Sequence, residues 1–405
     1  MTAVNPGHLK VELALGGVAV DASVRTRPEL LPALRDARHV LELLLPEDVV
    51  VDAPLANGRG VVSDSPAPHR LAYEGEQVFL QREPATRIEV RIIPPPQFYR
   101  ANTPHGIPMR RIGSVFGSFI ALNPLAPASD GPCTLCSGRP TEYDSAEPHP
   151  IVDVVDTVRT AFAEGAVEFV LFNASVTEAE DGGIAALEPY IRAVKRNFDT
   201  FVAVQMHPPR NNRWVDRTYA MGVDALTYSV EVHDADILAR CYPGRVAIIG
   251  RERYYEALAH AASIFPSGTV WSDLTVGIEP AESTMRGIDA LVQAGVLPVV
   301  SLAPPRHGVA PADAAAPRAE EVAPVLAHLF QATRQSKVNM GWVRELSFGI
   351  TPLEARFFAG EEARLSVAQQ FYRSRLGGMA ARNLARLRRR LRVRTVSDSF
   401  DSSRL

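Results

Sequence analysis

Cysteine is scarce in this sequence, with three residues among 405. So few cysteines exclude the disulfide framework of small exported domains and leave thiols for metal or redox chemistry in a reducing compartment. Long apolar runs are also absent, whereas a membrane span needs a run of about 18 apolar residues. The first residues, MTAVNPGHLKVELALGG, lack the basic region, apolar core and cleavage site of an export signal. We therefore expect a cytoplasmic protein without a membrane span.

A strong excess of one charge is absent as well. The chain has 43 Lys and Arg against 46 Asp and Glu, a balance that argues against nucleic acid as the main partner. Its composition, 46% hydrophobic and 22% charged, is typical of a soluble enzyme with two or three domains. Residues 375–394 are an exception, because they carry eight arginines and no acidic residue. They predict a basic helix, which either docks through its leucines or faces an anionic partner.

The first hundred residues predict a small α+β domain. Residues 10–20 and 86–96 have the composition of strands, residues 27–44 that of a helix, and proline-rich joints separate them. This region contains no catalytic signature, so we place the chemistry further along the chain.

Between residues 151 and 305 helices alternate with apolar strands. Amphipathic helices are predicted at 151–165 and 183–196, and nearly continuous apolar strands alternate with helices from residue 167 onward. This alternation predicts an α/β fold with parallel strands covered by helices, hence a full or partial βα barrel of the TIM type over residues 101–308. Residues 309–405 form a linker and a helical extension. The predicted strands are 167–173, 200–206, 224–232, 245–250, 269–277 and 297–303.

Polar residues follow the predicted strands. Because the carboxyl ends of barrel strands meet at one rim, these residues are expected to converge there. A single polar strand end is common, since each loop after a strand is solvated. Carboxylates at the ends of two apolar strands, however, need a cationic partner. We predict a ligand site at this rim. The strand-end residues are Asn173, Ala174 and Ser175; Gln205 and His207; Ser229 and Glu231; Gly277, Ile278 and Glu279; and Arg306 and His307.

Two stretches resemble the biotin-synthase-like branch of the radical SAM superfamily. Residues 222–258 include TYSVEV and GRERYYEAL, and residues 269–302 include VGIEP and GVLPVV; the resemblance extends over residues 105–305. It implies a radical SAM type of barrel and a [4Fe-4S] cluster held by three cysteines, with one iron open to S-adenosylmethionine. It also implies a reductant protein as partner and a biosynthetic reaction on a small metabolite, in which a 5′-deoxyadenosyl radical removes hydrogen from an unreactive carbon.

The expected cluster loop departs from the family pattern. Residues 123–138, NPLAPASDGPCTLCSG, carry Cys133 and Cys136, which match the last two ligands of the cluster. The first cysteine is missing, and in the common spacing Ser129 takes its place. The pair Cys133–Cys136 does not open a helix after a thioredoxin-like strand, so a redox disulfide is disfavoured. The remaining Cys241 is expected to be a small apolar core residue.

Three outcomes are open for this metal site. A cluster forms with an unusual third ligand, such as Ser129, Asp130, a histidine or Cys241. Alternatively no cluster forms, and the barrel binds S-adenosylmethionine for non-radical chemistry or acts as a binding subunit. In the third outcome the cysteine pair binds zinc with further ligands such as His105 or His149, although no second Cys-x-x-C is present.

The resemblance also assigns residues to S-adenosylmethionine. It implies contacts of Glu231 with the methionine and ribose end, where a carboxylate complements an ammonium and accepts from hydroxyls. Two other readings stay open: a salt bridge of Glu231 to Arg251 or Arg253, and a cap by Glu279 on the helix that follows it. The residues implied for this cofactor are Leu135, Asn173, Ala174, Ser175, Ser229, Glu231, Gly277, Ile278 and Glu279.

Substrate contacts are predicted in two loops over the barrel mouth. Their cations suit a small anionic or carboxylated substrate, whereas the alternative is that these side chains only cap helices and solvate loops. The predicted substrate residues are Gln205, His207, Arg210, Arg306 and His307.

Overall fold

The structure is a computed structural model that describes residues 4–36, 40–55, 69–82, 86–125, 147–165, 167–174, 177–302, 317–336, 338–340 and 349–360. Several predicted features lie outside these residues. They are Cys133, Leu135, Cys136, Ser175, Arg306, His307, the candidate ligands Ser129 and Asp130, and the basic segment 375–394.

The main body is a curved mixed sheet of eight strands within the described residues, in the order β14-β13-β12-β11-β10-β9-β8-β7. Neighbours from β8 to β13 pair in parallel, whereas β7 and β14 add antiparallel edges. Since β7 and β14 end this order in the part of the chain that the structure describes, the strands form a partial barrel there. The parallel strands and the helices between them confirm the α/β class. The strands are β7 (Gly113–Phe116), β8 (Phe119–Leu122), β9 (Phe169–Asn173), β10 (Phe201–Gln205), β11 (Ala225–Thr227), β12 (Val270–Val276), β13 (Leu297–Leu302) and β14 (Gly349–Ile350).

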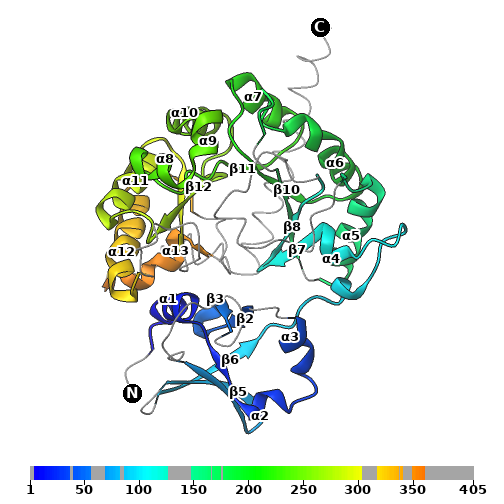
Figure 1. Ribbon diagram of the computed structural model, residues 1–405, viewed down its shortest axis with the longest axis vertical. Coiled ribbons are helices and arrows are strands. Elements are labelled where there is room, and N and C mark those ends of the chain that lie inside the picture. Colours follow the sequence, from blue (N-terminus) through cyan, green and yellow to red (C-terminus); the bar gives the residue numbers. More distant parts are fainter. Residues whose placement is uncertain are drawn as a thin grey trace.

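Helices cover the outside of this curved sheet in an open arc, with the strands on the inside (Figure 1). Those predicted at 151–165 and 183–196 are present as α5 and α6, and no helix in the described part of the chain is long and apolar enough to cross a membrane. The helices of this body are α4 (Met109–Ile112), α5 (Ile151–Ala163), α6 (Ile184–Asn197), α7 (Asn212–Ala220), α8 (Ala235–Cys241), α9 (Pro243–Ile248), α10 (Arg251–Ile264), α11 (Ala281–Gln293), α12 (Ala319–Gln335), α13 (Pro352–Ala355) and η3 (Arg356–Phe358).

The alternation of side chains along the strands separates two faces of the sheet. Even-numbered strand residues, such as Val170, Val202 and Leu274, pack with helix residues in the largest apolar cluster. Odd-numbered residues of β8 to β12 face the barrel interior, where they and Phe116 of β7 form a second cluster without helix residues. This inner cluster consists of Phe116, Phe119, Ala121, Phe169, Leu171, Phe201, Ala203, Ala225 and Trp271.

The N-terminal part forms a six-stranded sheet with its own apolar cluster, in the order β1-β4-β5-β6-β2-β3. A parallel bridge between Val18 and Leu55 connects its two ends. Helix α1 (Pro6–Gly16) lies between the two bodies, because Leu13 belongs to the N-terminal cluster and Val11 to the barrel cluster. The boundary near residue 100, like that near 308, stays a prediction. The other elements are β1 (Ala19–Val20), α2 (Ala22–Arg25), α3 (Leu31–Asp36), β2 (Val40–Leu44), η1 (Pro46–Asp48), β3 (Val50–Pro54), β4 (Arg70–Glu74), β5 (Gln77–Arg82), β6 (Thr86–Ile92) and η2 (Gln97–Arg100).

Three segments have another type of secondary structure than the sequence predicted. Residues 10–20 were predicted as a strand but mostly belong to α1, which starts at the Asn5 cap with Pro6 in its first turn. Residues 27–44 were predicted as one helix but contain the short α3 and then β2. The side chains of β2 alternate between more and less buried positions, and the strand pairs with β3 and β6. Residues 245–250 were predicted as a strand, but Pro243 starts α9 there.

A carboxyl group at the junction of the two bodies predicts a pH effect on stability. Glu42 lies opposite Asp52 in the β2–β3 ladder, and its Oε1 accepts a hydrogen bond of 3.1 Å from the Gly117 amide. Burial and the charge of Asp52 raise the pKa of Glu42 to about 7 from 4.5. Folded protein therefore holds this proton more tightly than the unfolded chain, so its contribution to stability decreases as pH rises from about 4.5 to about 7.

We expect Glu42→Gln to raise the free energy of unfolding by about 1–3 kcal/mol at pH 8 and to flatten its dependence on pH. Urea denaturation between pH 5 and pH 8 measures this, with the exposed Glu76→Gln as a control that changes little. Destabilisation by Glu42→Gln at pH 8 would mean that the hydrogen bond from Gly117 outweighs burial of the charge.

Candidate functional site

A row of polar side chains crosses the inner face of the barrel near the carboxyl ends of its strands. Asn173, Gln205 and Thr227 are in register on β9, β10 and β11, and each shares the inward parity of the residues below it. The Asn173 amide donates a hydrogen bond of 3.0 Å to Oδ1 of Asn123. Among the described residues, Asn173 Oδ1 and Thr227 Oγ1 are buried without a hydrogen-bond partner. Buried polar atoms of this kind point to a ligand, because leaving them unsatisfied costs about 1–3 kcal/mol each.

Two carboxylates, Glu231 and Asp273, lie on the same inner face where the chain after β11 meets β12. The chain after β11 runs along β12, where the Glu231 amide donates to the Asp273 carbonyl at 2.7 Å. Ser229 Oγ donates to Asp273 Oδ2 at 2.8 Å. Burial, together with the charge of Glu231, raises the pKa of Asp273 to about 6 from 3.8. The predicted residues Ser229 and Glu231 are thus brought together, and Asp273 joins them.

Arg245 explains why β11 ends early and why Glu231 has its conformation. Its guanidinium donates to the carbonyls of Ser229 at 2.5 Å and Val230 at 2.8 Å, where a strand would have paired with a neighbour. The same guanidinium lies 3.4 Å from Glu231 Oε1, and Tyr242 donates to Oε2 at 2.7 Å. Glu231 has φ of 66°, a left-handed conformation that needs such support. A salt bridge of Glu231 was one open reading, but its partner is Arg245.

The loop after β10, predicted to supply cations for a substrate, has a buried, neutral histidine and an exposed arginine. Nδ1 of His207 is hydrogen-bonded to the Tyr254 hydroxyl on α10, and burial with the nearby Arg245 lowers the pKa of His207 to about 3. His207 is therefore neutral at physiological pH. Arg210 is exposed, and its amide donates to the Glu180 carbonyl. The role of Gln205, His207 and Arg210 in substrate binding stays a prediction.

Glu279 accepts four hydrogen bonds from other parts of the chain through its carboxylate. Its carboxylate accepts from the amides of His233 at 3.0 Å and Asp234 at 2.7 Å, which precede α8. It also accepts from the hydroxyls of Ser283 at 2.8 Å and Thr284 at 3.3 Å in the first turn of α11. Glu279 was predicted to cap α11, and it does contact the first turn of this helix. The match is partial, because Glu279 accepts from side-chain hydroxyls there, whereas a cap accepts from backbone amides.

The backbone beside Glu279 is closely packed. Gly277 has φ of 99°, and a Cβ added there would lie 2.8 Å from Cδ of Pro317. Only glycine suits this position, which brings the β12 end close to the start of α12. Ile278 is buried in the apolar cluster that also contains Val232 and Leu238.

The remaining candidate ligands of a metal are dispersed. Cys241 packs beside this same cluster, and burial raises the pKa of its thiol, which disfavours a thiolate ligand. His105 Nδ1 is hydrogen-bonded to Asp153 Oδ1 at 2.9 Å, and the His149 amide donates to the Pro124 carbonyl. Within the described ranges, no group of three or more His, Cys, Asp or Glu residues could hold a metal ion.

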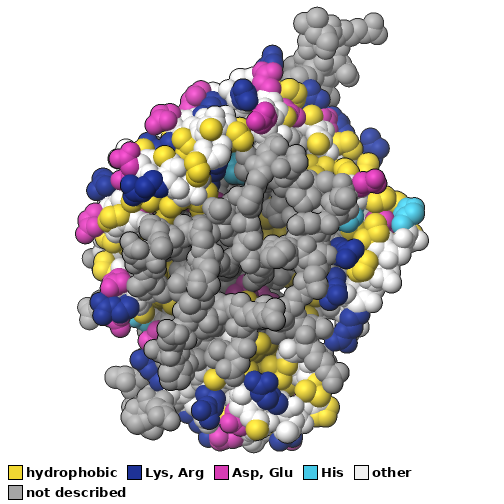
Figure 2. Space-filling view, in the orientation of Figure 1, with side chains coloured by type: hydrophobic (Ala, Val, Ile, Leu, Met, Phe, Trp, Pro, Cys, Tyr) yellow, Lys and Arg dark blue, Asp and Glu magenta, His cyan; other side chains and the backbone are white. Residues whose placement is uncertain are grey.

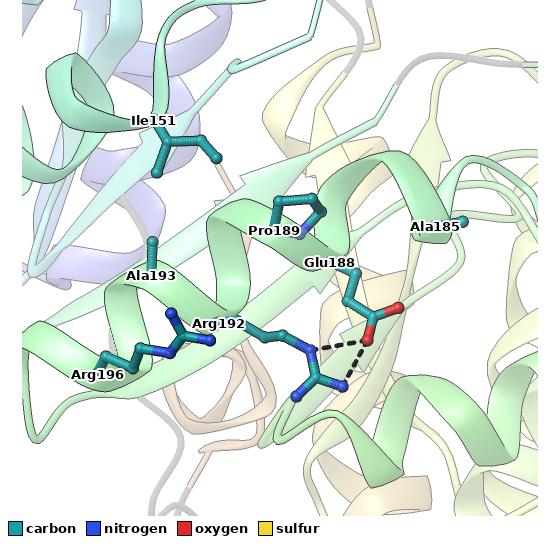
Figure 3. A pocket seen from close by; sticks show the side chains of 7 residues that line it. All are labelled: Ile151, Ala185, Glu188, Pro189, Arg192, Ala193 and Arg196. Carbon is teal, nitrogen blue, oxygen red and sulfur yellow. Dashed lines mark hydrogen bonds and ion pairs between the residues drawn. The ribbon is translucent and has the colours of Figure 1, made fainter.

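The outer surface offers a separate groove between α5 and α6, lined by Ile151, Pro189, Arg192 and Arg196 among others (Figure 3). Glu188 binds Arg192 across one turn of α6, so this cation is already paired. The groove lies on the helical face, away from the strand ends. On the face seen in Figure 2, Lys and Arg side chains are interspersed with Asp and Glu over the outer helices.

Several of these residues were missed from the sequence. Asp273 and Thr227 share the parity of the inward side chains, so alternation along a correctly placed strand could have indicated them. Arg245 begins a segment that was predicted as a strand, and Tyr242 lies three residues before it. Nothing in the local pattern indicates that this arginine contacts the chain after β11.

No protein-family model matches the chain. It is similar to the lipoyl synthase of Rubrobacter xylanophilus, with 26% identity over 181 residues, which are 44% of this chain and 53% of the relative. The chain thus spans about half the length of this curated relative.

Three solved structures show a low similarity to the chain. The FeFe-hydrogenase maturase HydG from Carboxydothermus hydrogenoformans has a TM-score of 0.42 and 16% identity, over 53% of this chain and 51% of its own. Streptococcus suis SuiB bound to S-adenosylmethionine has 0.41 and 12%, over 64% and 55%. A radical SAM methyltransferase from Sphaerobacter thermophilus has 0.38 and 13%, over 67% and 75%. Because these TM-scores are below 0.5, we describe the fold from the chain's own strand pairings. The similarity in sequence to a lipoyl synthase extends over part of each protein.

Proposed function

We propose that the chain is an S-adenosylmethionine-dependent enzyme of the radical SAM type, which acts on a small metabolite and has an atypical iron–sulfur site. The observation that supports this best is the polar end of β11 and β12, where Ser229, Glu231 and Asp273 meet inside a partial barrel of parallel strands. The partial similarity to a lipoyl synthase agrees with it.

In this proposal the chain's own residues bind and orient the cofactor. Glu231, fixed by Arg245 and Tyr242, accepts from the ribose hydroxyls or the methionine ammonium, and Ser229 lies beside it. The backbone of Asn173, Ala174 and Ser175 meets the methionine end, whereas Gly277, Ile278 and Leu135 flank the adenine. Glu279 acts indirectly, because its carboxylate already accepts four hydrogen bonds.

The unsatisfied acceptors Asn173 Oδ1 and Thr227 Oγ1 fit a cofactor or substrate that carries ammonium or hydroxyl donors. Cys133 and Cys136 are proposed as ligands of the cluster, and both lie outside the described residues. Cys241 fits poorly as the third ligand, since it packs against apolar side chains. When bound, the cluster and S-adenosylmethionine supply one-electron cleavage of a sulfonium and hydrogen abstraction from carbon.

The test is iron and sulfide analysis with electron paramagnetic resonance, after anaerobic purification and reconstitution. We expect about four irons per wild-type chain, loss of this iron in Cys133→Ala, and its retention in the matched control Cys241→Ala. Only the cluster-containing protein should form 5′-deoxyadenosine from S-adenosylmethionine with dithionite. Glu231→Gln should keep its iron and bind S-adenosylmethionine about tenfold more weakly, because it loses a charge-assisted hydrogen bond.

The alternative is a cluster-free barrel that binds S-adenosylmethionine for non-radical chemistry or serves as a binding subunit. The missing third cysteine favours it. Wild-type protein that stays free of iron after reconstitution but still binds S-adenosylmethionine would reject radical chemistry and support this alternative.

A further inference from the structure

The polar row on the inner face extends from β9 to β12 and presents mainly acceptors. Thr227 is fully buried, and its Oγ1 has no hydrogen-bond partner among the described residues. It has the inward parity of Ala225, one pleat below Ser229 on the same chain segment. Asn173 Oδ1, also without a partner, is in the same row through Gln205. Both atoms lie on the face to which Asp273 belongs, two residues above Trp271 of the inner cluster.

The charges around Asp273 give this row a negative character. Ser229 satisfies one oxygen of the carboxylate, and the charge of Glu231 acts on it. The cation beside Glu231, Arg245, is directed to Glu231 and to the carbonyls of Ser229 and Val230. A half-buried carboxylate next to a second carboxylate is costly unless a cation approaches it.

We propose that the substrate carries an amino group, which binds inside the barrel to Asp273 beside Thr227, and that Asp273 selects this class of substrate. An ammonium group has three N–H donors and a positive charge, so it complements a carboxylate and a neighbouring unsatisfied hydroxyl oxygen. A substrate carboxylate in the same position would be repelled by Asp273 and Glu231. The inference deepens the proposed function and rests on it, since the amino group would lie beside the Ser229 and Glu231 assigned to the cofactor.

The proposal differs from the anionic substrate expected from the loop arginines. Those cations, Arg210 and Arg306, were predicted in loops over the barrel mouth, whereas Asp273 lies on β12. A substrate with both an amino and a carboxylate group would satisfy both predictions, and in that case the amino group is the end bound inside.

The experiment measures probe binding to the full-length chain by titration calorimetry, without turnover. The probes are 1,4-diaminobutane and succinate, which have the same number of carbons and opposite charges. We expect the diamine to bind the wild type, to bind Asp273→Asn at least tenfold more weakly and to bind Thr227→Val several-fold more weakly. The matched control Asp216→Asn, on the outer helix α7, should change the affinity less than twofold.

The pH profile separates a direct contact from a structural role. Burial raises the pKa of Asp273 to about 6, and among the described residues the titratable group whose charge acts on it is Glu231. Diamine affinity should therefore fall as pH decreases from 7.5 to 5, because protonation of Asp273 removes the charge that the amine binds, and this fall should be absent in Asp273→Asn.

Equal binding of succinate and diamine, or unchanged diamine affinity in Asp273→Asn and Thr227→Val, would overturn the proposal. Unchanged far-UV circular dichroism of both variants excludes loss of fold as the cause of weaker binding. S-adenosylmethionine affinity is measured in parallel. Wild-type protein that does not bind S-adenosylmethionine would reject the proposed function. The diamine titrations test the amine site separately from that result.

Discussion

Glu354→Ala is expected to lower the free energy of unfolding by about 3–5 kcal/mol, one of the largest losses for a single substitution in this chain. Its Oε1 lies 2.5 Å from Nζ of Lys10 on α1, and the two side chains are 1% and 3% exposed. Its Oε2 accepts from the amide and the hydroxyl of Thr351 at the start of α13. The substitution leaves a buried ammonium without its carboxylate and removes the helix cap at the same time.

Urea denaturation at constant pH measures this loss. The exposed pair Glu74–Arg87 provides the control, because Glu74→Ala should cost less than about 1 kcal/mol. The double variant Lys10→Met with Glu354→Gln should recover part of the stability, since it removes both charges from the buried site. A loss below 1 kcal/mol in Glu354→Ala would mean that Lys10 reaches solvent or another partner when the carboxylate is removed.

This contact also shows why α1 could not be predicted. Val11, Leu13 and Leu15 alternate with Lys10, Glu12 and the small Ala14, a period of two that is typical of a strand with one buried face. In the fold, α1 packs against the N-terminal sheet on one side and the barrel on another, so apolar residues occur around much of the helix. The local signals that do indicate the helix are the Asn5 cap and Pro6 in its first turn.

The barrel elements between residues 151 and 302 were mostly predictable. α5 and α6 are strongly amphipathic, and β9 and β10 are apolar on both faces over most of their length because helices cover one face and the inner cluster lies on the other. The segment 224–232 was predicted as one strand, but its ladder stops at Thr227. Its end is determined by Arg245, which is distant in sequence and takes the carbonyls of Ser229 and Val230.

The candidate site was predictable at the level of strand ends. Ser229 and Glu231 meet β12 at the carboxyl edge because parallel strands place their ends together. The partners of individual side chains were not predictable, since they depend on neighbouring strands and helices. Glu279, assigned to the cofactor by resemblance, is the clearest case.

Glu279→Ala is expected to lower the free energy of unfolding by about 3–5 kcal/mol. The carboxylate is 6% exposed and accepts from two amides before α8 and two hydroxyls of α11. Its removal leaves these donors buried and unpaired, at about 1–3 kcal/mol for each that water cannot reach. Glu279→Gln should lose less, because its carbonyl oxygen still accepts hydrogen bonds.

The exposed Glu282→Ala in the first turn of α11 is the matched control and should change stability by less than about 1 kcal/mol. S-adenosylmethionine affinity, measured where each variant is still folded, then separates the two roles of Glu279. If the variant keeps its stability and loses affinity, Glu279 binds the cofactor directly. If it loses stability and the folded fraction keeps its affinity, Glu279 holds α8 and α11 together, and the site depends on it through the positions of Gly277 and Glu231.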